Sequence, residues 1–324
     1  MSTAPLSSTA SAPRKFTRLR QRGSRGRASR LLRETRELTA ATVLGAAALS
    51  SILITLAIVL VLGYESSSFF LAKEVRLSEF LTSTEWAPLF NPPKYGILPL
   101  VSATIMTTLI ALSVALPVGT IVAIYLSEFA PFALRESIKP SLELLSAVPT
   151  VVYGYFALMF VSPILQWLIP GLPRANMLSA GLVMGIMIIP YVSSLSEDAM
   201  RSVPMLLREG SYALGANKLL TAWRVVIPSA LSGIGAAYIL GISRAIGETM
   251  IVAVAAGMQP RFTFNPTAQA QTITAYIVAT SQGETPHGTI GYQSIFAAGL
   301  VLFVMTLAFN IFGYWLRRRY HQAY

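Results

Sequence analysis

Two residues of opposite charge, Arg244 and Glu248, lie four residues apart in the stretch SRAIGETMIV. The apolar run around them, residues 231–257, is long enough to cross a membrane as one helix. Arg244 would then lie near the middle, roughly 15–20 Å from either interface at about 1.5 Å of rise per residue, which is farther than its side chain reaches. An unpaired charge at that depth costs at least about 2.5–3.5 kcal/mol, so it must face protein, water or a ligand.

The chemistry that suits this pair is the passage of an oxyanion. A guanidinium offers planar, bidentate donors that fit phosphate-like oxygens. Glu248, one turn further on the same helix face, would partly neutralise Arg244 and so allow release, and it would accept a hydrogen bond from a protonated phosphate oxygen, which sulfate lacks. The alternative is a buried ion pair that holds two spans together. The small neighbours that allow close approach are Gly241, Ser243, Gly247 and Thr249.

The composition places these residues in an integral membrane protein. Of the 324 residues, 12% are charged and 54% are hydrophobic, whereas soluble domains carry about 25% charged residues. The chain has no cysteine, which excludes disulfides and thiol nucleophiles. Its two histidines, His287 and His321, are far apart in sequence, so no metal site and no catalytic group of an enzyme are expected.

Six apolar runs have the length of membrane-spanning helices, and alternating strands of the barrel type do not occur. The sequence therefore predicts an all-α membrane protein with six transmembrane helices. The expected spans are residues 39–62, 97–127, 144–168, 176–195, 231–257 and 294–316. The second run is too long for one perpendicular crossing, so it is expected to tilt or to bend at Pro117.

These spans divide the chain into parts with different environments. The expected parts are a disordered basic cytoplasmic tail (1–38), a first transmembrane helix (39–63), an extracytoplasmic segment (64–96) and a five-helix core (97–318) with a cytoplasmic loop at 196–230. Nineteen Lys and Arg residues fall on the side of the two termini and five on the opposite side. Because cytoplasmic loops are enriched in Lys and Arg, both termini are predicted in the cytoplasm, with the protein in the plasma (inner) membrane.

The net charge of +11 is concentrated in the N-terminal tail, where residues 1–39 hold ten Lys or Arg and two acids. A basic segment beside a span favours contact with anionic lipid. Nucleic-acid binding is disfavoured, because Phe16 is the one aromatic residue there that could stack on a base. Residues 1–33 also have the composition of an organellar transit peptide. We favour a retained first span, because its apolar run is too long for a cleaved signal.

The long cytoplasmic loop, residues 196–230, is amphipathic rather than uniformly polar. Apolar residues recur at helical spacing on both sides of Gly215, which suits a helix end or a tight turn. Pro228 marks the return into the membrane. The pattern predicts a helix–turn–helix under the membrane, and the alternative is a surface helix that rests on lipid headgroups.

Part of this loop, EGSYALGANKLLTAWRVVIP, resembles the signature loop of ABC-importer permeases. Glu209, Gly215, Ile227 and Pro228 match that pattern; Gly210 and Ser211 replace its two alanines, and Ala213 keeps a small residue nearby. The resemblance implies a coupling helix that docks in a groove of an ATPase subunit. The chain has no G-x-x-x-x-G-K-[ST] loop, so ATP and Mg²⁺ would be bound by that separate subunit, and no cofactor is expected on this chain.

The stretch LGISRAIGETMIVAVAAG resembles the fifth-span motif of the PstC family of phosphate-importer permeases, and the likeness runs from about residue 95 to the C-terminus. It implies the type I ABC-importer (MetI-like) transmembrane domain. It also implies three partners: a second, PstA-like permease, a homodimeric PstB-like ATPase and an extracytoplasmic PstS-like phosphate-binding protein. The residues expected along the anion pathway are Ser243, Arg244, Glu248 and Thr249.

Three other functions remain open at this point. The first is a permease for another oxyanion, such as sulfate or molybdate. The second is an ion-coupled secondary carrier that works without an ATPase. The third is a membrane scaffold or sensor that transports nothing.

Overall fold

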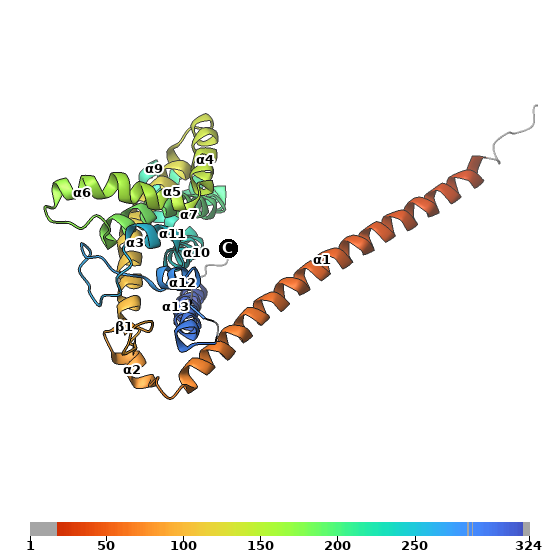
Figure 1. Ribbon diagram of the computed structural model, residues 1–324. Helices are drawn as coiled ribbons and strands as arrows, with labels where there is room; N and C mark the ends of the chain where they lie inside the picture. Colours follow the sequence, from red (N-terminus) through yellow and green to blue (C-terminus); the bar gives the residue numbers. More distant parts are fainter. Residues whose placement is uncertain (1–17, 284, 287, 320–324) are drawn as a thin grey trace, which may run out of the picture. The chain divides into compact units, whose positions relative to one another are not determined.

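The computed structural model describes residues 18–283, 285, 286 and 288–319. In this part of the chain, six helices are long and apolar enough to cross a membrane, which confirms the predicted fold class (Figure 1). They are Arg36–Leu71, Leu98–Phe129, Thr150–Leu168, Met177–Arg201, Lys218–Ile246 and Ile290–Trp315.

The chain divides into two units, residues 1–61 and residues 62–324, and each is described by itself. The first unit contains most of helix α1 (Arg18–Leu71). Residues 1–17 of the expected tail lie outside the described residues, and residues 18–38 are helical where disorder was expected. The segment Arg18–Leu71 contains no proline, so nothing stops the helix at either expected end of the first span, residues 39 and 63.

Helix α7 (Met177–Arg201) is the centre of the second unit, and more of it is buried than of the other spans. It packs against α3 (Leu98–Ile124) on one side and α10 (Ile227–Ile246) on another (Figure 1). Helix α3 continues into one π-helical turn, η1 (Tyr125–Phe129). The functional residues described below therefore lie on or beside a buried central helix.

Two glycines of α7 determine how closely it approaches α3. A Cβ atom on Gly181 would lie 2.7 Å from the Cβ of Ile110, and one on Gly185 would lie 2.8 Å from the carbonyl oxygen of Ala111. Side chains at these positions would push the helices apart. The sequence GLVMG at 181–185 is therefore a packing motif.

The third span begins later than residue 144. Helix α4 (Phe132–Ala147) ends before Pro149, the backbone of Val148 and Pro149 is extended, and α5 (Thr150–Phe156) starts the span. A proline disfavours helical backbone at the residue before it, which explains the break. The span continues through η2 (Ala157–Val161) into α6 (Ser162–Leu168).

The segment between the first two spans folds around aromatic side chains. It contains α2 (Leu77–Thr82) and an antiparallel pair, β1 (Trp86–Ala87) with β2 (Lys94–Tyr95). Trp86 is buried, and its ring meets that of Tyr276 edge-on with 5.1 Å between the centroids. Tyr276 belongs to α12 (Ile273–Ser281), so the hairpin is fixed to the segment before the last span. The hydropathy pattern does not predict the hairpin.

The remaining helices follow α7 in chain order. They are α8 (Met205–Ala213), α9 (Lys218–Thr221), the π-helical turn η3 (Ala222–Val226), α11 (Met250–Ala255) and α13 (Ile290–Arg319).

Candidate functional site

The predicted fifth span, residues 231–257, is two helices rather than one. Helix α10 ends at Ile246, residues 247–249 are not helical, and α11 begins at Met250. The Oε1 atom of Glu248 accepts hydrogen bonds from the backbone N–H of Met250 (3.2 Å) and of Ile251 (3.3 Å). The N–H groups in the first turn of a helix have no carbonyl partner within that helix. The buried Glu248 carboxylate, in a side chain that is 8% exposed, therefore caps α11.

Arg244 lies in the last turn of α10 and does not pair with Glu248. The prediction that the two charges share one helix face is wrong, because the helix ends between them. The guanidinium carbon of Arg244 lies 4.1 Å from the ring centroid of Tyr191 on α7. Within the part of the chain that the structure describes, Arg244 forms no ion pair and its buried Nε has no hydrogen-bond partner. The side chain is partly exposed, so its charge is neither neutralised nor sealed away.

The other residues expected along the pathway are engaged in local contacts. The hydroxyl of Ser243 donates to Oδ1 of Asn310 on α13 at 3.0 Å. The hydroxyl of Thr249 donates to the carbonyl oxygen of Gly247 at 3.2 Å. These contacts fix the end of α10 and the break that follows it. Of the four residues expected along the pathway, Arg244 is therefore the one whose N–H donors are left for a ligand.

The loop between the fourth and fifth spans has the predicted helix–turn–helix form. Helix α8 is followed by a turn in which Gly215 has φ of +83°, a conformation that residues with a side chain rarely adopt. Asn217 begins the second helix, and its side chain accepts a hydrogen bond from the backbone N–H of Leu220 at 2.8 Å. This helix, α9, leads through η3 into α10.

The loop presents an exposed surface. Exposed apolar side chains include Leu206 (78%) and Leu214 (91%). Pro228, at the start of α10, is exposed, and Ile227 beside it is partly buried. Of the other residues assigned to the signature loop, Glu209 and Gly215, which match its pattern, and Gly210 and Ala213, which do not, are exposed.

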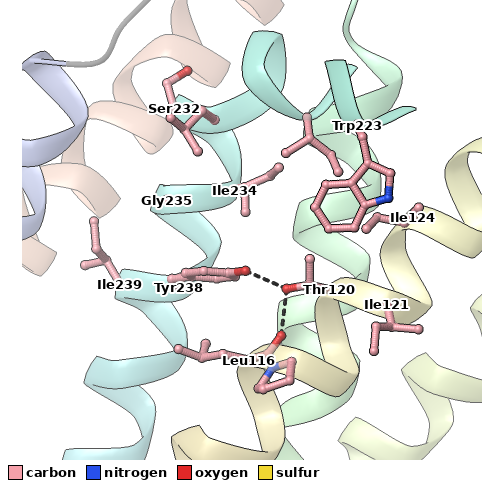
Figure 2. A pocket seen from close by; sticks show the side chains of 13 residues that line it. Leu116, Thr120, Ile121, Ile124, Trp223, Ser232, Ile234, Gly235, Tyr238 and Ile239 are labelled. Carbon is pink, nitrogen blue, oxygen red and sulfur yellow. Dashed lines mark hydrogen bonds between the residues drawn. The ribbon is translucent and has the colours of Figure 1, made fainter. Parts of the chain in front are cut away.

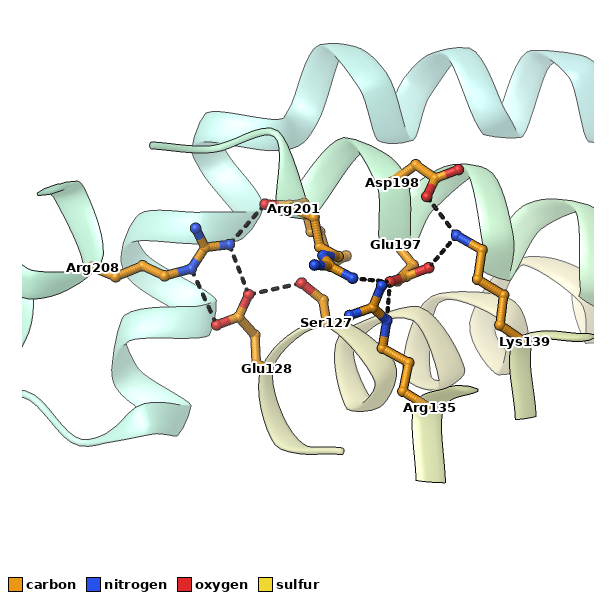
Figure 3. A network of polar contacts seen from close by, with 9 residues as sticks. Ser127, Glu128, Arg135, Lys139, Glu197, Asp198, Arg201 and Arg208 are labelled. Atoms are coloured by element: carbon orange, nitrogen blue, oxygen red, sulfur yellow. Dashed lines mark hydrogen bonds and ion pairs between the residues drawn. The ribbon is translucent and has the colours of Figure 1, made fainter. Parts of the chain in front are cut away.

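Arg208 is the buried residue of α8, and it fixes this exposed helix to the rest of the unit (Figure 3). Its guanidinium donates to the carbonyl oxygens of Met200 and Val203, and it forms an ion pair with Glu128 of η1 at 3.1 Å. Arg208 therefore links α8 to the end of α7 and to η1, which continues α3. Sequence reasoning did not assign a role to either charged residue.

A second ionic network joins α4 to α7 (Figure 3). Glu197, which is fully buried, lies 2.9 Å from Arg135, 2.9 Å from Lys139 and 3.5 Å from Arg201. Lys139 also contacts Asp198 at 2.6 Å. Burial lowers the pKa of Lys139, but its hydrogen bonds to Asp198 and Glu197 outweigh burial and raise that pKa above its ordinary value, so the side chain stays charged at neutral pH. Sequence reasoning missed this network, because its members come from different helices.

A wide hollow of about 640 Å³ lies between α3, η3 and α10 (Figure 2). Isoleucine, leucine and Trp223 side chains supply most of its wall, and Tyr238 and Thr120 hydrogen-bond to each other there. Among the residues that the structure describes, no charged one lines it. The hollow therefore lacks the donors that an oxyanion needs, and it is distinct from the surroundings of Arg244.

The fold and the position of these residues define a class of membrane transport subunit. Residues 115–322 match the family described as binding-protein-dependent transport system inner membrane component. The chain belongs to this family, which makes it a multi-pass inner-membrane permease subunit of an ABC importer. Such a subunit works together with an ATPase and other subunits.

Two relatives and one solved structure illustrate the likeness. The chain is 34% identical over 291 residues to the probable ABC transporter permease protein YqgH of Bacillus subtilis (strain 168), covering 90% of this chain and 94% of that protein. It is 36% identical over 249 residues to the phosphate transport system permease protein PstC of Xylella fastidiosa (strain 9a5c), covering 71% and 75%. A bacterial ABC transporter involved in alginate import has a TM-score of 0.61 at 16% identity, covering 90% of this chain and 100% of that chain, which shows the fold alone.

Proposed function

We propose that this chain is the permease subunit of an ATP-driven importer of inorganic phosphate, and that Arg244 contacts the anion in transit. The observation that carries the proposal is a partly exposed arginine in a membrane-spanning segment, with no ion pair among the described residues. Its planar donors suit a phosphate oxygen pair. The substrate follows from relatives such as PstC of Xylella fastidiosa, which is named a phosphate transport permease.

The neighbours of Arg244 have supporting roles in this proposal. Ser243 fixes the end of α10 through Asn310, and Glu248 with Thr249 maintains the break beside Arg244. A discontinuous helix in a membrane is tolerated where it is buried in protein or lines a cavity. In this proposal, backbone and side chains of residues 243–249 lie next to the path of the anion.

The exposed loop is the proposed contact with the ATPase. Its residues Glu209, Gly210, Ala213 and Gly215 are exposed on or beside α8, while Ile227 and Pro228 begin α10. Docking at this surface would move α8, and Arg208 would pass the movement to α3 and α7. ATP and Mg²⁺ belong to the ATPase in this arrangement, and this chain hydrolyses nothing by itself.

The remaining partners are a second, PstA-like permease that completes the pathway, two copies of a PstB-like ATPase and a PstS-like phosphate-binding protein outside the membrane. Both termini and α8 lie in the cytoplasm, in accord with the excess of Lys and Arg on that side.

Uptake by the complete importer in proteoliposomes tests the proposal. With ATP supplied to the ATPase side, we expect uptake of radiolabelled phosphate that excess sulfate or molybdate does not displace. Arg244→Gln should reduce uptake at least tenfold with the subunits still copurifying, whereas Arg261→Gln, a change of an exposed arginine, should have little effect. Uptake of sulfate instead would assign another oxyanion, and uptake without ATP would indicate a secondary carrier.

A further inference from the structure

Tyr191 is the residue that the structure places against the charge of Arg244. The distance of 4.1 Å from the guanidinium carbon to the ring centroid is well inside the about 6 Å over which a ring face attracts a cation. The ring belongs to α7 and the arginine to α10, so the contact joins two spans.

The packing of α10 on α7 determines this contact. A Cβ atom on Gly241, one turn before Arg244, would lie 3.1 Å from Cγ2 of Val192, the residue after Tyr191. A side chain at residue 241 would crowd Val192, so the two helices pack closely beside the pair. This close approach of α10 and α7 brings Arg244 near the ring of Tyr191.

An aromatic ring and a carboxylate hold an arginine in different ways. A carboxylate accepts hydrogen bonds from the guanidinium and cancels its charge, so an incoming oxyanion would have to displace it. A ring face supplies neither an oxygen nor a negative charge. The nearest acid in sequence, Glu248, has its Oε1 engaged with the N–H groups of Met250 and Ile251. Arg244 thus keeps its charge and its donors.

The surroundings of Tyr191 are open rather than sealed. Its side chain is partly exposed, and its hydroxyl forms no hydrogen bond within the described residues. Tyr191 also lines a hollow of about 200 Å³ between α4 and α7, together with Glu143, Ser146 and Ser194. Water and small ions therefore have room beside the ring that holds Arg244.

We propose that Tyr191 is a positioning residue of the anion site, whose ring holds the Arg244 guanidinium in place and leaves its charge and its N–H donors to the anion. This inference rests on the proposed function, because it takes Arg244 as the residue that contacts the anion. If Tyr191 only filled space, a side chain of similar volume could replace it, whereas the positioning role needs an aromatic ring.

The test measures KM and Vmax for phosphate uptake by the complete importer in proteoliposomes. Tyr191→Phe keeps the ring, so both constants should stay within about twofold of wild type. Tyr191→Leu should raise KM at least fivefold with Vmax little changed. Tyr191→Glu should raise KM further, because a carboxylate would neutralise Arg244. As a matched control, Tyr155→Leu, at a tyrosine of α5 that is 57% exposed, should leave KM unchanged.

The outcomes separate this inference from the proposed function. If Arg244→Gln abolishes uptake while Tyr191→Leu leaves KM unchanged, or if Tyr191→Phe is as harmful as Tyr191→Leu, the positioning role is wrong and the anion contact stands. If Arg244→Gln leaves phosphate uptake unchanged, the anion contact itself is wrong, and the role of Tyr191 is lost with it.

Discussion

Glu248 caps the N-terminus of α11, and this role decides which substitutions it tolerates. Glu248→Gln keeps an oxygen that accepts from the N–H groups of Met250 and Ile251, so we expect a thermal unfolding temperature in nanodiscs close to wild type. Glu248→Ala leaves buried donors without a partner and should destabilise the protein by about 1–3 kcal/mol. A Gln variant as unstable as the Ala variant would contradict the capping role, whereas normal stability with no uptake would give the carboxylate a second role at the anion.

The sequence indicates which residues are charged in the fifth span but not what they contact. Apolar residues flank the break at residues 247–249 on both sides. A glycine inside a helix costs only about 1 kcal/mol, so a single helix was the natural prediction. The contact of Arg244 with Tyr191 depends on how closely α10 packs on α7 at Gly241. Such a contact between distant segments cannot be deduced from local spacing.

Helix α4 is held to the molecule mainly by charge, since none of its residues is buried. Glu197→Gln removes the negative charge that Arg135, Lys139 and Arg201 share. Breaking a buried ionic contact costs about 3 kcal/mol or more, so we expect residues 132–147 to exchange backbone hydrogens much faster in deuterium-exchange mass spectrometry.

Asp198→Asn is the matched control, because Asp198 is largely exposed and contacts Lys139 alone in the described network. In this variant, the local stability of α4 measured by exchange should change by less than about 1 kcal/mol. Because the pKa of Lys139 is raised, its contribution is fully present at neutral pH and is lost only as pH rises above 10.5, its ordinary value. Equal exchange in the two variants, or a loss of protection between pH 6 and 9, would contradict this account of α4.

The turn after α8 requires a left-handed residue at Gly215, whereas Gly210 lies within the helix, so the two glycines are unequal. A Cβ atom would meet nothing within 4 Å at Gly210 or at Gly215, so space does not distinguish them. Gly215 alone has a positive φ, where a side chain costs roughly 1–2 kcal/mol. We expect Gly215→Ala to lower phosphate uptake and copurification of the ATPase, and Gly210→Ala to leave both unchanged. Equal effects of the two changes would argue against a docking role for the turn.

The elements whose signal in the sequence is hydropathy, a glycine or a proline were predicted well. The number of spans and the helix–turn–helix around Gly215 are examples. Other boundaries were missed where the signal is local geometry or tertiary packing. Pro149 moves the start of the third span to Thr150. The aromatic contacts of Trp86 stabilise a hairpin whose strands, of two residues each, are too short to give a pattern in the sequence.

At the scale of the whole molecule, a continuous set of contacts joins the exposed loop to Arg244. Arg208 fixes α8 to the ends of α3 and α7, and α7 carries Tyr191, which holds Arg244. A rigid, buried helix between two sites provides a physical route for coupling. On this basis the ATPase contact and the anion site are expected to move together, through α7.

The orientation of the chain decides whether that coupling is possible, because ATP is available in the cytoplasm. An even number of spans places both termini on one side, and the nineteen Lys and Arg residues on that side favour the cytoplasm. We expect a fusion after residue 324 to carry a fluorescent reporter that folds only in the cytoplasm, and a fusion after residue 90 to carry an active phosphatase that folds only outside. The reverse result would place α8 outside the membrane, away from any ATPase, and the proposed docking surface would be wrong even if Arg244 contacts an anion.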